Sequence, residues 1–230
     1  MDLGAAAEIL RRDPSGGGPR PARAGSIRQP TKGYHATRRG RDICELLNHL
    51  GGDPAVVVGW SLGVQEVLVC AHEFGTKRIR AIVLVDHPVV IDPKIVLAIV
   101  GERIESLQVN REAWTRRFVK DILRKPPSDA YLEALTQAAL STPTNAAAIM
   151  MANLYFLGPT DLGPALDALD RPVLFVYSSL EWAVAAAEDV RKGWPKVPIK
   201  VIDEPSHALF VAKPQEFNRV LEEFLASLPK

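Results

Sequence analysis

The strongest constraint on the fold is a short apolar segment that turns directly into a helix. Residues 55–60, AVVVGW, are rich in β-branched side chains and follow the turn sequence GGDP, which is typical of a buried strand. After Ser61, apolar side chains recur at helical spacing as far as Gly75. The turn reads GWSLG over residues 59–63, and side chains in place of its two glycines would collide with the neighbouring strand and helix. The pattern predicts a serine hydroxyl held beyond the strand end by a strained backbone.

The alternation of strand and helix continues along the chain. Further apolar runs stand at 78–85, 172–178 and 197–202, and helical patterns separate them. These runs are apolar on both faces, which favours parallel strands covered by helices on both sides. The stretch between the second and third strands holds three helical segments, far more chain than one crossover needs. We therefore expect an α/β fold, a mostly parallel sheet flanked by helices, with an inserted helical cap at about residues 90–168.

The start of the chain differs in composition from the rest. Residues 1–41 hold nine Lys or Arg and three acids, whereas residues 42–230 hold nineteen and twenty-four. Nine of the twenty-one residues from Asp13 to Gly33 are Gly or Pro. Such a composition gives little apolar surface to bury, and no aromatic side chain is interleaved with the arginines to stack on bases. We expect residues 1–33 to be a mobile basic segment that binds no nucleic acid, and residues 34–230 to form the α/β core with its cap.

A serine hydroxyl is a poor nucleophile near neutral pH and needs a neighbouring base. His207 stands in the loop DEPSH between the last predicted strand and the final helix, and it is the candidate base. The free N–H groups at the start of the helix after Ser61 can stabilise an oxyanion, and the backbone N–H of Leu62 is the first candidate donor.

At these residues the chain resembles the α/β-hydrolase family, in which nucleophile, acid and histidine follow in that order. Ser61 matches the nucleophile, His207 in PSHALF matches the base, and KPQEFNRVLEEFL is similar to the terminal helix. The resemblance covers residues 34–230, and cofactor-free haloperoxidases are similar in the same motifs. It implies an esterase-like enzyme that needs no cofactor and no metal, with Trp60 at the substrate-binding site.

Two acids compete for the third position of the triad. Asp86 directly follows the strand after the nucleophile helix, where some members of the family place the acid. Glu181 falls where most members place it, but there the chain reads SSLE and lacks the family's turn glycine. The sequence favours Asp86 and leaves Glu181 open. His87, beside Asp86, is expected to shape the site rather than act as base.

The residues before 34 do not match the family, and this difference leaves two functional hypotheses open. Nothing before residue 34 resembles the family's early strands or the loop that supplies its second oxyanion donor. The leading hypothesis is a serine hydrolase that cleaves a small ester, thioester or lactone through an acyl-enzyme on Ser61. Under this hypothesis the cap roofs an apolar pocket. The alternative is a catalytically incomplete hydrolase fold that binds a ligand.

Composition limits the kinds of binding partner that the chain is expected to have. The net charge is +1, so no anionic macromolecule or membrane surface is expected, and the substrate is a small acyl compound. Cys44 and Cys70 each lie in an apolar helical pattern, and we interpret them as small buried side chains rather than a disulfide. No metal-ligand spacing, secretory signal or membrane-spanning run is recognisable. A cytoplasmic monomer or homodimer is expected.

Overall fold

The computed structural model describes residues 7–8, 32–154 and 160–229, with the backbone alone over residues 7–8 and 93–99. Most of the segment predicted to be mobile, residues 1–33, therefore lies outside the described residues. The same holds for the end of the third predicted cap helix.

The sheet has the predicted parallel strands. β2 (Ala55–Trp60), β3 (Ile79–Val85), β4 (Val173–Tyr177) and β5 (Ile199–Val201) are parallel and adjacent in that order. The two-residue strand β1 (Ala7–Glu8) pairs antiparallel with the end of β2. Because parallel strands carry their carboxyl ends to one edge, the residues after β2, β3 and β4 meet there. This confirms the predicted α/β fold.

Helices cover both faces of the sheet. The core helices are α1 (Ala36–Leu50), α2 (Leu62–Phe74), α7 (Gly163–Asp167), α8 (Glu181–Gly193), α9 (Leu209–Ala212) and α10 (Pro214–Ser227). One buried cluster joins side chains of α1, α2, α7 and α8 to one face, through strand residues such as Val57, Ile82 and Phe175. The other cluster joins α10 to the opposite face through Val83 and Val176. The strands are thus buried on both faces, which is why their sequences are apolar throughout.

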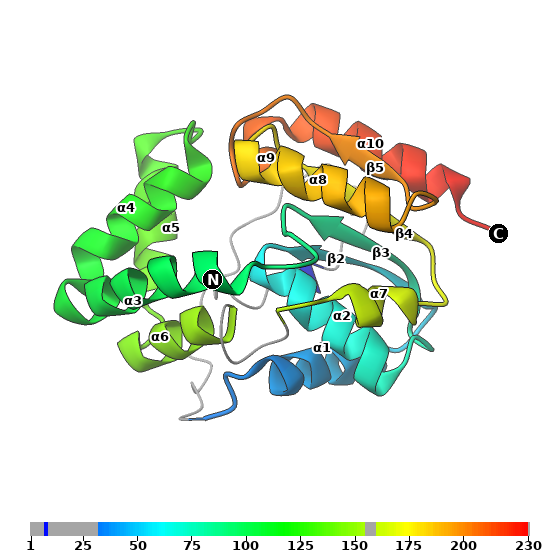
Figure 1. The fold of residues 1–230 in the computed structure, drawn as a ribbon, viewed down its shortest axis with the longest axis horizontal. Helices are drawn as coiled ribbons and strands as arrows, with labels where there is room; N and C mark the ends of the chain where they lie inside the picture. Colours follow the sequence, from blue (N-terminus) through cyan, green and yellow to red (C-terminus); the bar gives the residue numbers. More distant parts are fainter. Residues whose placement is uncertain (1–6, 9–31, 155–159, 230) are drawn as a thin grey trace.

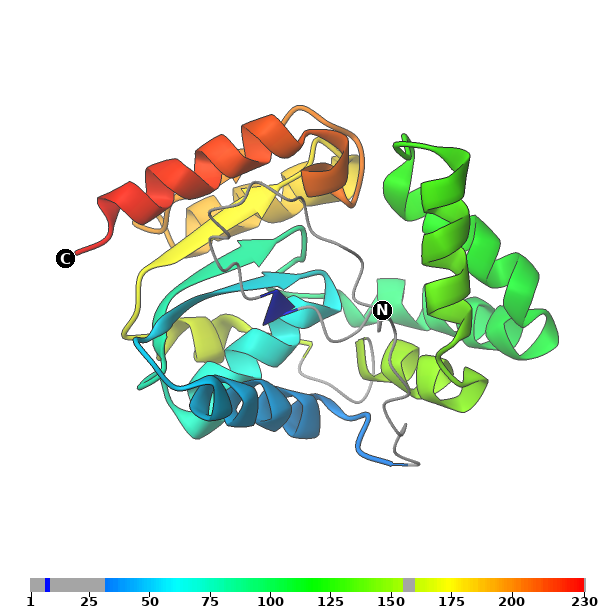
Figure 2. The same ribbon diagram turned by 180° about the vertical axis from the view of Figure 1, so that it is seen from behind.

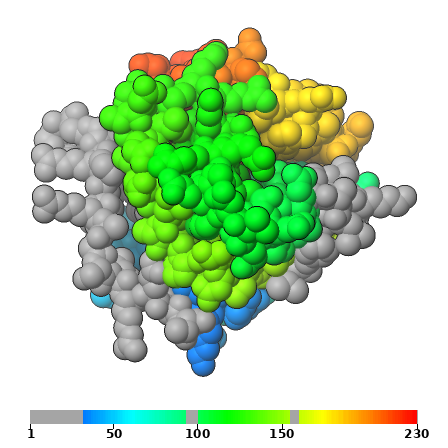
Figure 3. Space-filling model, turned by 90° about the vertical axis from the view of Figure 1, so that its left-hand side faces the viewer, coloured from blue at the N-terminus to red at the C-terminus, as the bar shows by residue number. Residues whose placement is uncertain are grey.

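The remaining helices lie together beside the sheet. They are α3 (Pro93–Val109), α4 (Arg111–Leu123), α5 (Asp129–Leu140) and α6 (Thr144–Ala152), all between β3 and β4 in the chain. Figures 1 and 2 show them gathered at one side of the molecule, and Figure 3 shows them across the middle of that face. We call α3–α6 the cap. Sequence patterns indicated α4, α5 and α6 but not α3, and α7 packs on α2 in the core although it lies within residues 90–168.

Helices α1 and α2 are held together more closely than the sequence indicated. Cys44 and Cys70 form a disulfide with their Cα atoms 5.8 Å apart, so the interpretation of two separate buried thiols was wrong. The helices approach closely at Gly40, where an added Cβ would lie 2.6 Å from a Val69 methyl group. This contact brings the two cysteines within bonding reach, and periodicity along a single helix does not reveal such an approach.

Candidate active site

Ser61 lies in the predicted tight turn between β2 and α2. Its backbone has φ 52° and ψ −125°, a conformation that costs energy for a residue with a side chain. The turn is fixed by a hydrogen bond from the Ser61 N–H to the Val85 carbonyl (3.0 Å). A Cβ on Gly59 would lie 2.7 Å from the Gly63 carbonyl oxygen, so the glycine is required there, as the sequence indicated. The hydrogen bond to Val85 and the close approach of the backbone at Gly59 and Gly63 impose the strained conformation and hold the serine at the carboxyl end of the sheet.

The start of α2 supplies a hydrogen-bond donor next to that serine. Within the described part of the chain, the backbone N–H of Leu62 has no acceptor, as expected for the first residue of a helix. Its side chain is buried against Met150 and Leu154 of the cap region, which fixes the backbone on which the N–H stands. This N–H is therefore available to an anion that forms at Ser61.

Asp86 and His207 form a pair at the same edge of the sheet. The carboxylate Oδ2 of Asp86 lies 2.8 Å from Nδ1 of His207. Ser178 adds two donors, its N–H to Oδ1 (2.8 Å) and its hydroxyl to Oδ2 (3.0 Å). Asp86 is fully buried, so these donors replace the water that an isolated carboxylate would require. Asp86 also has positive φ (53°), because the chain turns sharply at the end of β3.

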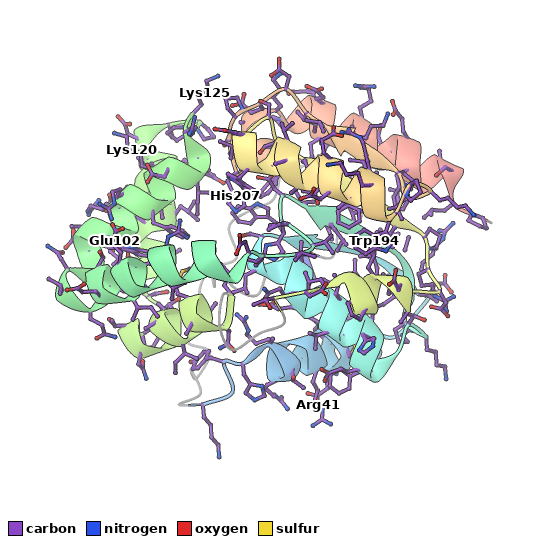
Figure 4. The ribbon with its side chains drawn as sticks, viewed as in Figure 1. Arg41, Glu102, Lys120, Lys125, Trp194 and His207 are labelled. Carbon is purple, nitrogen blue, oxygen red and sulfur yellow. A yellow bond between two sulfur atoms is a disulfide. The ribbon has the colours of Figure 1, made fainter. Side chains whose placement is uncertain are left out.

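The imidazole of His207 packs between two indole rings. Trp60 lies 5.1 Å away by ring centroids and donates its indole N–H to the His207 carbonyl (2.8 Å). Trp182 makes an edge contact at 5.6 Å. Because Trp60 directly precedes Ser61, these contacts place His207 against the nucleophile turn. No hydrogen bond joins the described side chains of Ser61 and His207; in unliganded enzymes such bonds often form only when substrate binds. Figure 4 shows His207 between the cap and the helices of the core.

His87 is buried beside this pair. Burial, followed by the nearby His207, lowers the pKa of His87 from 6.5 to about 3, so its ring is neutral at neutral pH. Its Nε2 atom has no hydrogen-bond partner among the described residues. Its carbonyl accepts the hydroxyl hydrogen of Tyr177 (3.0 Å), and burial raises the pKa of that tyrosine. At neutral pH the His87 ring therefore places no positive charge beside His207.

Comparison with known proteins shows the family of the chain. A family model described as the alpha/beta hydrolase family matches residues 16–220. The chain belongs to the alpha/beta hydrolase family. The match starts before residue 34, where the similarity was expected to begin, and it confirms the family and fold that the sequence indicated.

Relatives and solved structures resemble this hydrolase over most of its length. It is 26% identical over 210 residues to a pimeloyl-[acyl-carrier protein] methyl ester esterase of Vibrio campbellii, covering 86% of this chain and 82% of the relative. A bromoperoxidase from Bacillus anthracis superposes with a TM-score of 0.79 at 20% identity, over 88% of this chain and 78% of that one. An esterase from Exiguobacterium antarcticum gives 0.75 at 17% identity, with the same two coverages. These two structures support the fold.

The structure brings some of the hydrolase's predicted site residues together and leaves one apart. Ser61, Asp86 and His207 meet at the sheet edge, with Trp60 and Leu62 beside them. Glu181 is exposed in the first turn of α8, and no hydrogen bond or ion pair joins it to His207 among the described residues. The carboxylate that touches the imidazole is therefore that of Asp86.

Sequence reasoning missed the residues that support this arrangement. Ser178 was read only as part of a departure from the family's turn, yet it donates twice to Asp86. Its signal was its place directly after a fully buried strand, which lies beside the strand that Asp86 follows. Ser206, which bonds the cap, had no signal beyond its position before His207.

Neither of the two described cavities is the apolar pocket expected under the cap. The two described cavities, of about 420 and 320 Å³, lie away from Ser61; the larger is lined by α1, β2, β3 and α10. Within the described chain there is no cluster of His, Cys, Asp or Glu that could hold a metal ion. No helix in that part of the chain is long and apolar enough to cross a bilayer.

Proposed function

We propose that this hydrolase cleaves a small ester, thioester or lactone through an acyl-enzyme on Ser61. Family membership and the esterase names of its curated relatives support ester hydrolysis as the reaction class. The observation that carries the finer proposal is the hydrogen bond between buried Asp86 and His207 beside the strained Ser61 turn. A buried carboxylate on Nδ1 of a histidine leaves Nε2 as the basic nitrogen, which is what serine activation requires.

The proposed reaction uses four groups of this chain. His207 Nε2 takes the hydroxyl proton as Ser61 Oγ attacks the carbonyl carbon, and Asp86 stabilises the imidazolium that results. The Leu62 N–H donates to the oxyanion. The carbonyl re-forms, the bond to the leaving alcohol or thiol breaks, and His207 returns its proton to that group. Water then attacks the acyl-enzyme, with His207 again as base, and releases the acid and free Ser61.

Apolar surroundings support an uncharged acyl or alkyl group near Ser61. Leu62 packs with Met150 and Leu154, and Trp60 and Trp182 flank the imidazole. A curated relative acts, by its name, on a methyl ester of an acyl group carried by a protein. For this chain we propose the shared chemistry only, a short ester or thioester whose acyl part is apolar next to the reacting carbon.

The alternative, a ligand-binding protein with an incomplete catalytic apparatus, keeps one observation in its favour. Only one oxyanion donor, the Leu62 N–H, can be named within the described residues. Removing one such donor typically costs about 10²- to 10³-fold in kcat, so a site with a single donor would be slow. The geometry favours the enzyme, because a binding protein has no need of a buried Asp86–His207 pair next to a strained serine.

Active-site labelling separates the two functions. The protein is incubated with a fluorophosphonate, and the adduct is located by mass spectrometry while hydrolysis of p-nitrophenyl butyrate is followed in parallel. If the chain is a serine hydrolase, we expect an adduct on Ser61. Ser61→Ala and His207→Ala should both abolish the adduct and the hydrolysis of the ester. A folded wild-type chain that neither labels nor hydrolyses the ester would establish the alternative.

A further inference from the structure

The loop that carries His207 is bonded to the end of a cap helix. The buried hydroxyl of Ser206 lies 3.0 Å from both the Ile122 and the Leu123 carbonyl oxygens, and its single hydrogen is shared between them. The N–H of Ala208 donates to the same Ile122 carbonyl (3.2 Å). Ile122 and Leu123 are the last two residues of α4. The residues on either side of His207 therefore form hydrogen bonds to the carboxyl end of α4 in the cap.

The same loop is bonded to the nucleophile turn. The indole N–H of Trp60 donates to the His207 carbonyl, and its ring makes an edge contact with Phe210 at 5.1 Å. Ala208 belongs to an apolar cluster with residues of cap helices α4 and α5, and Trp60 packs against this cluster together with residues of α9. The backbone of His207 is thus fixed between Ser61's neighbour and the cap.

The helix end that receives these bonds is itself strained. Arg124, directly after α4, has φ 47°, and the other described non-glycine residues with positive φ are Ser61 and Asp86. Such conformations persist where the surrounding structure imposes them. Lys125 also reaches Glu204 of the same loop, with nitrogen and oxygen 3.7 Å apart. The three strained positions are therefore Ser61, Asp86 and Arg124, the residue directly after the helix end that bonds the His207 loop.

Asp86 alone does not determine where the imidazole points. One hydrogen bond to Nδ1 fixes one ring atom, whereas the direction of Nε2 toward Ser61 also depends on where the His207 backbone lies. A displacement of about 1 Å between reacting groups can cost on the order of 10²-fold in rate. The bonds to the His207 backbone and its neighbours are those that prevent such a displacement.

Building on the proposed function, we propose that the carboxyl end of cap helix α4 positions the catalytic base, with Ser206 and Trp60 as positioning residues. The cap then acts on the chemical step as well as on access to the site, because any shift of α4 relative to the sheet moves His207 relative to Ser61. Neither residue needs to touch the substrate for this role.

The test removes each bond with little change of shape. Ser206→Ala deletes the shared hydroxyl bond, and Trp60→Phe keeps an aromatic ring but deletes the indole donor. We expect kcat for p-nitrophenyl butyrate to fall about 10- to 100-fold in each variant. KM of Ser206→Ala should stay within about twofold of wild type, because positioning is lost rather than binding. Ser206→Cys, which keeps the volume and a weak donor, should recover part of the loss.

Two matched variants control for the loss of a hydroxyl or an indole donor elsewhere. Ser227→Ala removes a hydroxyl that bonds the Phe224 carbonyl at the end of α10 (2.7 Å). Trp194→Phe removes an indole N–H that bonds Asp167 (2.6 Å), on the far side of the core from His207 in Figure 4. Both should leave kcat within about twofold of wild type, because neither bond reaches the His207 loop.

Hydrogen exchange measures how firmly the His207 loop is bonded to α4, independently of enzyme turnover. The Ala208 amide should exchange faster in Ser206→Ala than in wild type, since its acceptor on α4 is then less firmly held. Unchanged kcat in folded Ser206→Ala and Trp60→Phe overturns the inference while leaving the proposed function intact. So does a fall of kcat in the two control variants that equals the fall in Ser206→Ala and Trp60→Phe. If Ser206→Ala does not fold, Ser206→Cys and Trp60→Phe decide the question. A wild-type chain that neither labels nor hydrolyses removes the proposed function and this role with it.

Discussion

The carboxyl ends of β3 and β4 lie side by side, and each is followed by an acid, yet the two acids have different environments. Asp86 comes directly after β3, is fully buried and bonds His207. Glu181 comes four residues after β4, begins α8 and faces solvent. The Asp86 carboxylate is therefore buried at the sheet edge, whereas the Glu181 carboxylate lies in solvent beyond it.

The ends of β3 and β4 supply, respectively, the carboxylate of Asp86 and hydrogen-bond donors to it. β3 supplies the carboxylate of Asp86, and Ser178 after β4 supplies two of its donors. The register makes this possible, since Val85 pairs with Val176 and the Asp86 N–H donates to the Val176 carbonyl (2.9 Å). A carboxylate is usable here only where the neighbouring strand offers donors to a buried charge. After β4 the chain therefore supplies donors to the Asp86 carboxylate, whereas Glu181, where most members of the family place the acid, makes no bond to His207 among the described residues.

Replacing Asp86 tests this comparison with the largest effect. Asp86→Asn keeps the shape but removes the charge that stabilises the imidazolium, and it favours the wrong tautomer of His207. We expect kcat for p-nitrophenyl butyrate to fall by about 10⁴-fold. Circular dichroism checks that the variant is folded. Activity within tenfold of wild type would return the role of acid to another residue.

The buried histidine beside Asp86 should make stability depend on pH. The folded-state pKa of His87 is about 3, below its ordinary 6.5, so the unfolded chain binds more protons between these values. The stability is fully present above pH 6.5 and is lost as the pH falls toward 3, with a slope of up to about 1.4 kcal/mol per pH unit. Urea unfolding of His87→Gln should show a shallower decline over this range. Exposed His72→Gln is the control, and equal slopes in wild type and His87→Gln would contradict the burial of a neutral ring.

The donor from β4 should have a moderate effect. Ser178→Ala removes the hydroxyl bond to Asp86 and retains the backbone N–H bond. We expect kcat/KM to fall by about tenfold, close to the free energy of one hydrogen bond to a charged group. Ser179→Ala is the matched control, since Ser179 bonds the Glu204 carbonyl through its backbone N–H. An equal loss in both variants would mean that the turn, rather than the hydroxyl, matters.

The smallest effect is expected at the exposed acid. Glu181→Gln removes a charge that faces solvent and makes no bond to His207, so kcat/KM should stay within about twofold of wild type. The same assay as for Asp86→Asn measures it. A loss near that of Asp86→Asn would reverse the comparison between the two strand ends.

Local pattern carried much of the fold. The four parallel strands, the turn at Ser61 and the helices after it follow from runs of apolar residues and from glycines, which act over a few positions. Helix α3 was missed although Pro93 stands at its start, and the disulfide was misread because it depends on how α1 meets α2. Features that depend on how two elements meet were left open, missed or misread from the sequence.

The sequence by itself determined which residues could act, namely a serine at a strand-to-helix turn and a histidine before the last helix. Only the tertiary structure decided which acid lies in hydrogen-bond contact with that histidine and which groups hold the histidine loop. The Asp86–His207 bond spans 121 residues of chain, and the bond from Ser206 to the cap spans 84. Periodicity reports which face of an element is buried, but it does not report which distant element packs there. The folded sheet and cap fix those distances, because burial leaves each polar group only the partners that packing brings within reach.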